Sequence, residues 1–252
     1  MKLLYRIYQL FVAVPLVVLI TIFFSLLTMV GCALGDSKYW GFVPLQYWCR
    51  MVLALFFLPA KSEGHEHLDK NQSYVFVPNH QGAFDIFLIY SCLRHNIRWM
   101  MKYQLRKIPF VGRACVSSNQ VFLDKRGPKR IRESYEKARG ILKDGVSLVV
   151  FPEGARTFTG HMGKFKKGAF TLADELQMPV VPVTINGSFQ VMPRMRDWHF
   201  VCRHPLSLTI HKPIYPIGKG EENIAYVMKE SYEAVMSALE PDFQGLQENP
   251  DQ

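Results

Sequence analysis

Residues 74–85 read YVFVPNHQGAFD, an apolar run followed directly by a histidine and an aspartate. The run is typical of a buried strand. His80 and Asp85 are five positions apart, and in one regular helix of ~3.6 residues per turn they would point about 140° apart. We therefore predict a strand over 74–77, a loop bent at Gly82 and a helix over 83–94, because in that order the two side chains can meet.

The pair of His80 and Asp85 predicts acid–base chemistry. A carboxylate can hold one imidazole nitrogen and leave the other free to act as a base. Residues 79–85 contain no serine or cysteine for such a base to activate, so the predicted proton donor is a hydroxyl group of the substrate. Aspartate is also a favoured residue at a helix N-cap, and Asp85 is open to that structural use as well.

Strand-like and helix-like segments alternate through the rest of the chain. Further strands are predicted over 120–123, 147–151, 180–185 and 206–211, and Pro182 suggests that its strand is an edge or irregular. Pro128 is expected to open a helix that Gly145 stops, and further helices are predicted over 169–177 and 221–239. This alternation predicts an α/β fold, a mostly parallel sheet flanked by helices.

The amino-terminal region predicts a hydrophobic two-helix membrane hairpin. Leu10–Leu34 is a run of 25 residues without a charge, which exceeds the ~20 residues needed to cross a bilayer. Lys2 and Arg6 precede the run, so the amino terminus is expected on the cytoplasmic side. A second apolar segment over 40–60 is interrupted by Arg50. The hairpin is therefore either two spans or two helices within one leaflet, and two core helices of a soluble fold remain the alternative.

Composition sets the domain boundaries and limits the kinds of site. The 252 residues are divided into a membrane-associated hairpin over 1–60, a polar linker over 61–72, a catalytic domain over 73–240 and an acidic flexible tail over 241–252. Five scattered cysteines predict neither a disulfide framework nor a thiolate metal site, and no metal is expected.

The stretch from Lys102 to Arg139 is strongly basic, with eleven lysines and arginines against three acidic residues. Beside a membrane hairpin, attraction to anionic lipid explains this charge better than nucleic-acid binding does. A membrane-anchored module that binds anionic lipid without turnover is one reading of the chain, and a solvated helix face is another.

Three further segments carry candidate ligand-binding residues. They read FPEGAR over 151–156, FKKGAF over 165–170 and VPV over 181–183. In an open parallel sheet, ligands gather at the carboxyl ends of the strands. The loops that carry His80 and Arg156 are both expected there, where they would offer a base and a cation that can grip a phosphate.

Together with the motif from Asn79 to Asp85, these ordered segments resemble the blocks of the glycerolipid acyltransferases, most closely those of bacterial 1-acyl-glycerol-3-phosphate acyltransferases. The resemblance covers roughly residues 73–190, and the hydrophobic hairpin fits it too. Lys102, Leu105 and Gly112 match a further block. The chain departs from the pattern at Lys125, where an arginine is expected, and at Ala155, where a threonine is common.

The resemblance implies transfer of an acyl group from an acyl-carrier-protein or coenzyme A thioester to the free hydroxyl of a lysophosphatidate, with no cofactor. His80 would be the base and Asp85 its partner, and no acyl-enzyme would form. The implied phosphate-binding residues are Glu153, Gly154, Arg156, Lys102, Lys125 and Arg126. Further motif residues are Asn79, Lys166, Lys167, Gly168, Val181 and Pro182. Another lysolipid acceptor is the alternative that Lys125 and Ala155 leave open, and hydrolysis is a weaker one.

Overall fold

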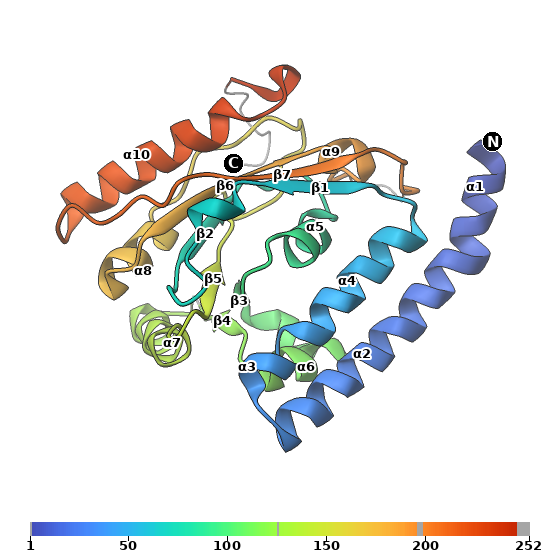
Figure 1. Ribbon diagram of the computed structural model, residues 1–252, viewed down its shortest axis with the longest axis horizontal. Helices are drawn as coiled ribbons and strands as arrows, with labels where there is room; N and C mark the ends of the chain where they lie inside the picture. Colours follow the sequence, from blue (N-terminus) through green and yellow to red (C-terminus); the bar gives the residue numbers. More distant parts are fainter. Residues whose placement is uncertain (1, 125, 196–198, 246–252) are drawn as a thin grey trace.

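The computed structural model describes residues 2–124, 126–195 and 199–245. Within them a seven-stranded sheet has the order β1-β7-β6-β2-β5-β3-β4 (Figure 1). The strands are β1 (Ala60–Glu63), β2 (Val75–Pro78), β3 (Ile97–Lys102), β4 (Val121–Leu123), β5 (Ser147–Val149), β6 (Val180–Asn186) and β7 (Leu206–Ile210). From β6 to β4 all neighbours are parallel, whereas β7 is antiparallel to β6 and parallel to β1. The predicted α/β class and mostly parallel sheet are confirmed.

Two helical layers cover the sheet, because successive residues of each strand point to opposite faces. Phe76 lies in a core with residues of α4 (Val43–Leu55) and α5 (Asp85–Cys92). Val75 and Val77 lie in the other core, with residues of α7 (Pro128–Ile141), α8 (Gly168–Leu176) and α10 (Glu221–Ser237). Figure 1 shows these two groups of helices on opposite sides of the strands.

The amino-terminal helices form a hairpin that packs against the first of these layers. It begins with α1 (Lys2–Tyr8), a π-helical turn η1 (Gln9–Ala13) and α2 (Val14–Leu34), and it returns through α3 (Ser37–Trp40) and α4. Among the described residues, one helix, Leu3–Leu34, is long and apolar enough to cross a membrane. The 13 residues of α4 reach only ~20 Å at ~1.5 Å per residue, which is too short for a bilayer core of ~30 Å.

The side chains of α2 are arranged opposite to those of an ordinary surface helix. The residues it buries are Phe24, Ser25, Thr28 and Gly31, a stripe that repeats about every turn and is mostly small or polar. Its large apolar side chains, such as Phe23 at 60% exposed, point outward. Small residues toward the protein and large apolar residues outward are typical of a helix in lipid. The alternative of two buried core helices does not fit α2.

Two predicted boundaries are wrong. Residues 61–72 are not a linker, because β1 pairs in parallel with β7 and a 3-10 turn η2 (His65–His67) follows it. The predicted tail is folded over 241–245, where the 3-10 turn η4 (Pro241–Phe243) places the Phe243 ring 5.5 Å from that of Phe189. Residues 246–252 lie outside the described part of the chain.

Pro182 lies in the middle of the sheet, so the predicted edge strand is wrong and the predicted irregularity is right. The carbonyl of Pro182 accepts the His211 amide on the β7 side. Pairing shifts by one residue there, from Val183 with Ile210 to the isolated bridge of Val180 with Ile214. The missing N–H of proline is tolerated because it falls where the ladder is already interrupted.

Candidate active site

His80 and Asp85 meet as the spacing predicts. His80 lies in the loop after β2, and Asp85 is the first residue of α5. Nδ1 of His80 is 2.6 Å from Oδ2 of Asp85, and the backbone amide of Gly82 donates to the same oxygen at 3.1 Å. The Asp85 side chain is fully buried, whereas that of His80 is 16% exposed. The carboxylate is therefore held in place while the imidazole keeps access to the surface.

The plane of the imidazole is fixed by aromatic stacking. The His80 ring lies 3.7 Å from the ring of Phe151, with 10° between the planes, and Phe151 stacks in turn on Trp99 at 5.3 Å. Nε2 of His80 makes no hydrogen bond to any residue that the structure describes. The ring is therefore held on one face and at Nδ1, and Nε2 is its other nitrogen.

The Glu153 side chain is hydrogen-bonded to the backbone of His80. Its Oε1 accepts the His80 amide at 2.7 Å, and its Oε2 accepts the Gly163 amide at 2.8 Å. Burial raises the pKa of the Glu153 carboxyl to about 8, against the lowering effect of the two amide donors. The implied phosphate contact of Glu153 does not fit this geometry, because both oxygens are buried and accept backbone amides.

The residues around His80 tie its loop to three neighbouring segments. Asn79 exchanges two hydrogen bonds with the backbone of Ile185 in β6, at 2.9 and 2.7 Å. Gln81 donates to the carbonyl of Gly160 at 3.0 Å. A side chain at Gly82 would collide with Ser188, in the short helix α9 (Ser188–Val191). Asn79 and Gly82 are therefore residues that the loop geometry requires.

Arg156 follows the same strand end as Glu153 and is half-buried. Its guanidinium makes no hydrogen bond or ion pair to a described residue, so it is available to an anion. Gly154 has a φ of +79°, which favours glycine, and the ammonium group of Lys166 lies beside it. The sequence analysis missed Arg194, whose guanidinium donates to the Arg156 carbonyl at 3.1 Å and lies 4.1 Å from the ring centre of Phe158.

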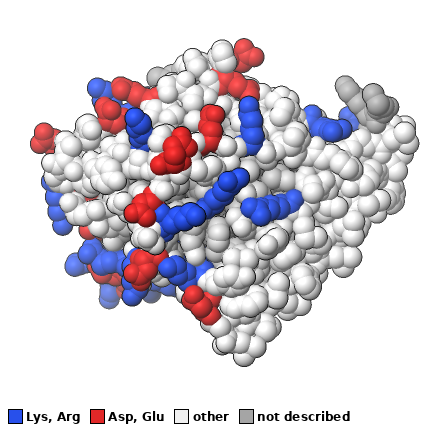
Figure 2. Space-filling view, viewed as in Figure 1, with Lys and Arg blue, Asp and Glu red and all other residues white. Residues whose placement is uncertain are grey.

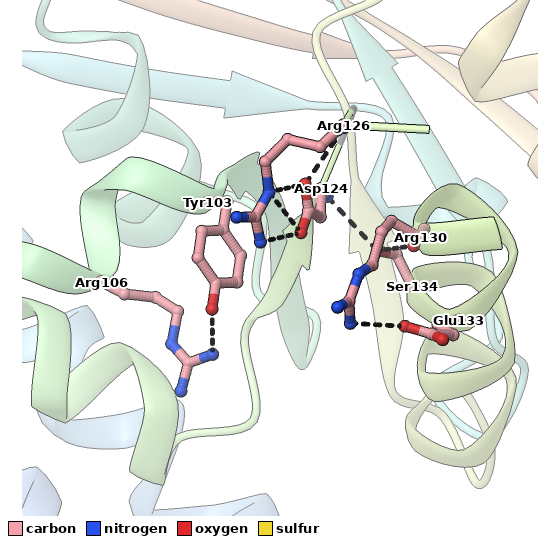
Figure 3. A network of polar contacts seen from close by, with 7 residues as sticks. All are labelled: Tyr103, Arg106, Asp124, Arg126, Arg130, Glu133 and Ser134. Carbon is pink, nitrogen blue, oxygen red and sulfur yellow. Dashed lines mark hydrogen bonds and ion pairs between the residues drawn. The ribbon is translucent and has the colours of Figure 1, made fainter. Parts of the chain in front are cut away.

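The other predicted phosphate contacts lie further along the sheet edge. Lys102 ends β3 and is exposed. Arg126 follows β4 and grips Asp124 with two nitrogens at 2.8 and 2.6 Å (Figure 3). This contact holds the pKa of the Asp124 carboxyl down at about 2. With strands ~4.8 Å apart, β4 is about 14 Å from β2, so Arg126 is less suited than Arg156 to a group held at His80. Lys125 lies outside the described residues.

The remaining motif residues shape the sheet and one helix start. Val181 and Pro182 pair with Phe76 and Val77 and so align β6 beside the strand that leads to His80. Gly168 begins α8. Lys167 forms an exposed ion pair of 2.7 Å with Glu221 of α10, and is therefore directed away from the histidine loop.

Comparison with known proteins adds three findings. A family model described as Acyltransferase matches residues 60–186. The 1-acyl-sn-glycerol-3-phosphate acyltransferase BAT2, chloroplastic, of Brassica napus is 34% identical over 155 residues, which cover 61% of this chain and 44% of that protein. The 1-acyl-sn-glycerol-3-phosphate acyltransferase of Saccharomyces cerevisiae is 29% identical over 197 residues, covering 76% of this chain and 64% of that protein. The match thus spans less than two thirds of these relatives.

A solved structure is similar over nearly the whole chain. The crystal structure of the 1-acyl-sn-glycerophosphate (LPA) acyltransferase PlsC from Thermotoga maritima has a TM-score of 0.73 and 28% sequence identity, and the match covers 92% of both chains. The range of the family model contains the strand-end loops with His80, Glu153 and Arg156.

Proposed function

The chain belongs to the acyltransferase family, and from this we propose that it transfers an acyl group from a thioester to the free hydroxyl of a 1-acyl-glycerol-3-phosphate, giving phosphatidic acid. The observation that carries the proposal is the 2.6 Å contact between His80 Nδ1 and a fully buried Asp85. Relatives with the printed name 1-acyl-sn-glycerol-3-phosphate acyltransferase support the choice of acceptor.

In the proposed reaction, Nε2 of His80 takes the proton of the acceptor hydroxyl as its oxygen attacks the thioester carbonyl. Asp85 keeps the other proton on Nδ1 and stabilises the imidazolium that forms. The new ester C–O bond replaces the C–S bond, and the imidazolium returns its proton to the departing thiolate sulfur. The substrate hydroxyl is the nucleophile, so no acyl-enzyme is required.

Arg156 is the proposed principal contact of the acceptor phosphate. It lies in the loop after β5, the neighbour of the strand β2 that leads to His80, and a guanidinium can grip a phosphate with two parallel hydrogen bonds. Gly154 lets the backbone approach closely, and Lys102 and Lys166 add positive charge at the same edge. Because Asp124 holds Arg126, we assign Arg126 no more than a long-range attraction.

We also propose that the hairpin lies in one leaflet of the membrane, with the catalytic domain on the cytoplasmic side. Figure 2 shows the surface over α2 as almost free of charged side chains, whereas α4 carries the exposed Arg50. The helix α2 packs on α4 and on α6 (Val111–Ser117). If α2 crossed the bilayer, these two helices would have to enter it as well, together with the exposed Arg113 of α6. An arginine at the bilayer centre costs at least ~2.5 kcal/mol, so insertion into one leaflet is favoured.

The test is acyl transfer by the purified chain in lipid vesicles. His80→Ala should lose nearly all turnover, whereas His65→Ala, in η2 at the far edge of the sheet, should keep it. Mass spectrometry of products from mixed lysolipids and from mixed carrier-protein and coenzyme A thioesters would identify acceptor and donor. Near-normal turnover by His80→Ala would refute the base, and a preference for an uncharged headgroup would remove the phosphate role from Arg156.

A further inference from the structure

The η3–α6 segment, residues 103–117, combines exposed apolar and basic side chains. It consists of the 3-10 helix η3 (Tyr103–Lys107), a short connection and α6. Four large apolar side chains are 37–44% exposed, namely Leu105, Ile108, Phe110 and Val116. Arg106, Lys107 and Arg113 are exposed between them. Apolar and basic side chains interleaved in this way are typical of a surface that lies in a membrane interface.

The positive charge of this segment is not balanced from within the protein. No acidic residue occurs between Asp85 and Asp124 in the sequence. None of the three basic side chains of the segment pairs with a carboxylate of a described residue. On α7, by contrast, Glu133 and Glu136 accept Arg130 and Arg139 at 3.1 and 3.8 Å. An external anion is therefore expected to bind the η3–α6 segment in preference to α7.

The segment adjoins the apolar surface of the hairpin. α6 packs directly on α2, and Figure 1 shows it beside the carboxyl-terminal half of that helix. The outward face of α2 there includes Leu26, Val30 and Leu34, all exposed. The two apolar surfaces thus continue into each other, and a bilayer that covers α2 comes up to the segment.

The local geometry holds the segment in an exposed conformation. Phe110 has a φ of 57° and a ψ of −59°, a region that non-glycine residues rarely adopt. Tyr103 lies between two guanidinium groups, with Arg106 at 5.2 Å and Arg126 at 5.1 Å from its ring centre (Figure 3). Asp124 already holds Arg126, so Arg106 is the one of these two guanidinium groups that has no acidic partner among the described residues and is open to a phosphate group.

We propose that the η3–α6 segment is a second membrane-contact element, which binds the headgroups of an anionic leaflet. Leu105, Ile108 and Phe110 enter the boundary between headgroups and acyl chains, and Arg106, Lys107 and Arg113 bind lipid phosphates. With α2 it fixes the tilt of the catalytic domain at two separate places. The inference rests on the proposed membrane location of this acyltransferase, and it does not require turnover.

The test is hydrogen–deuterium exchange of the full chain bound to two kinds of vesicle, phosphatidylcholine alone and phosphatidylcholine mixed with phosphatidylglycerol. Peptides from residues 103–117 should exchange several-fold more slowly on the anionic vesicles. Arg106→Gln, Lys107→Gln and Arg113→Gln combined should abolish this difference. A matched triple variant on α7, Lys129→Gln, Arg132→Gln and Lys137→Gln, makes the same change in net charge and should preserve it.

Equal exchange over 103–117 on both vesicles would overturn the inference, as would slowing confined to α7. Slowing that requires an added acidic carrier protein, and not anionic lipid, would assign the segment to a protein partner instead and would also overturn it. The inactive His80→Ala variant should still show the slowing. Turnover of lysophosphatidate without slower hydrogen exchange over 103–117 would refute this inference alone. Slower exchange without turnover would refute only the proposed reaction.

Discussion

The carboxyl group of Glu153 accepts the backbone amide of His80 at 2.7 Å, so a residue from the loop after β5 fixes the main chain of the proposed base. The other oxygen of Glu153 accepts the amide of Gly163 at 2.8 Å. One buried side chain therefore joins two loops at the carboxyl ends of adjacent strands. We therefore propose that Glu153 positions His80 and makes no contact with the substrate.

Glu153→Gln should change stability relative to the wild type by an amount that depends on pH. Below its pKa the wild-type carboxyl group is protonated and resembles a carboxamide, since each accepts one of the two amides and presents a donor to the other, so the two proteins should then differ little. In the wild type the folded pKa of about 8 lies above the ordinary value of 4.5. The folded state therefore binds more protons than the unfolded state between these values, and Glu153 makes stability fall as pH rises, with a limit of about 1.4 kcal/mol per pH unit.

The wild type should thus lose stability relative to Glu153→Gln as pH rises from 4.5 to about 8. Urea unfolding in mild detergent at several pH values measures this change, and Glu175→Gln on the exposed end of α8 controls for the loss of an exposed carboxyl group. A wild type that gains stability relative to Glu153→Gln over this range would contradict the raised pKa.

Asp85→Asn should reduce kcat strongly and leave the KM of both substrates nearly unchanged. An amide can hold the imidazole in position, but it permits the wrong tautomer and does not stabilise the imidazolium. In a serine–histidine–aspartate triad the equivalent change lowers kcat by about 10⁴-fold. Initial rates over a range of acceptor concentrations test this, and a loss of only a few fold would mean that Asp85 acts mainly as a structural residue of α5.

Gly82→Ala should disrupt the histidine loop, because its Cβ would collide with both oxygens of Ser188, one of them backbone. Gly168→Ala is the matched control, since a Cβ there has nothing within 4 Å. We expect the first variant to lose most activity together with about 1–3 kcal/mol of stability, the usual cost of overpacking. Activity assays and thermal unfolding compare the two, and equal effects would show that the loop can move away.

The His80 loop was predictable because its residues constrain each other locally. A spacing of five excludes one regular helix, and Gly82 marks the bend, so strand, loop and helix followed from one short stretch. Periodicity located β2, β5, β6, α7 and α10 for the same reason, since each has a clear apolar pattern. The carboxyl ends of β2 and β5 were therefore expected at the same edge of the sheet, and the structure adds that the two strands are neighbours.

What sequence could not predict depends on distant partners. β3 escaped notice because Arg98 interrupts its apolar pattern, yet that side chain is buried and donates to the carbonyl of Ser37 at 3.0 Å. β1 looked like a polar linker because an edge strand needs only its pairing with β7. Glu153 was implied as a phosphate contact, since no sequence pattern reveals that two backbone amides occupy its oxygens. Arg194 gave no signal, because it joins the site only through the fold.

Arg156→Gln should raise the KM for a phosphate-bearing acceptor and leave the KM for the thioester unchanged. A hydrogen bond to a charged group contributes about 1.5–3 kcal/mol, which corresponds to a roughly 10- to 150-fold change. Arg156→Lys should recover part of it, because lysine keeps the charge but loses the bidentate grip. Steady-state kinetics with Arg139→Gln on α7 as control test the assignment, and an equal effect on both substrates would contradict it.

Phe243→Ala should reduce turnover, because Phe243 packs against a loop that is hydrogen-bonded to the His80 loop. The Phe243 ring contacts Gly160, whose carbonyl accepts Gln81, the residue after His80. The same ring lies 6.0 Å from that of His161, so it packs against two successive residues of the loop. Because the ring is only half-buried, its loss should cost less than the 3–5 kcal/mol of a buried phenylalanine, about 1–2 kcal/mol.

Removing Phe243 should therefore lower kcat several fold while the melting temperature falls by only a few degrees. Phe243→Leu, which keeps apolar contact with Gly160, should restore most of the activity. Gln244→Ala is the matched control on the same turn, because its side chain binds the Leu239 carbonyl and does not face the loop. If activity were unchanged in Phe243→Ala, the loop over 157–163 would hold its shape without η4, and the carboxyl-terminal turn would serve stability alone.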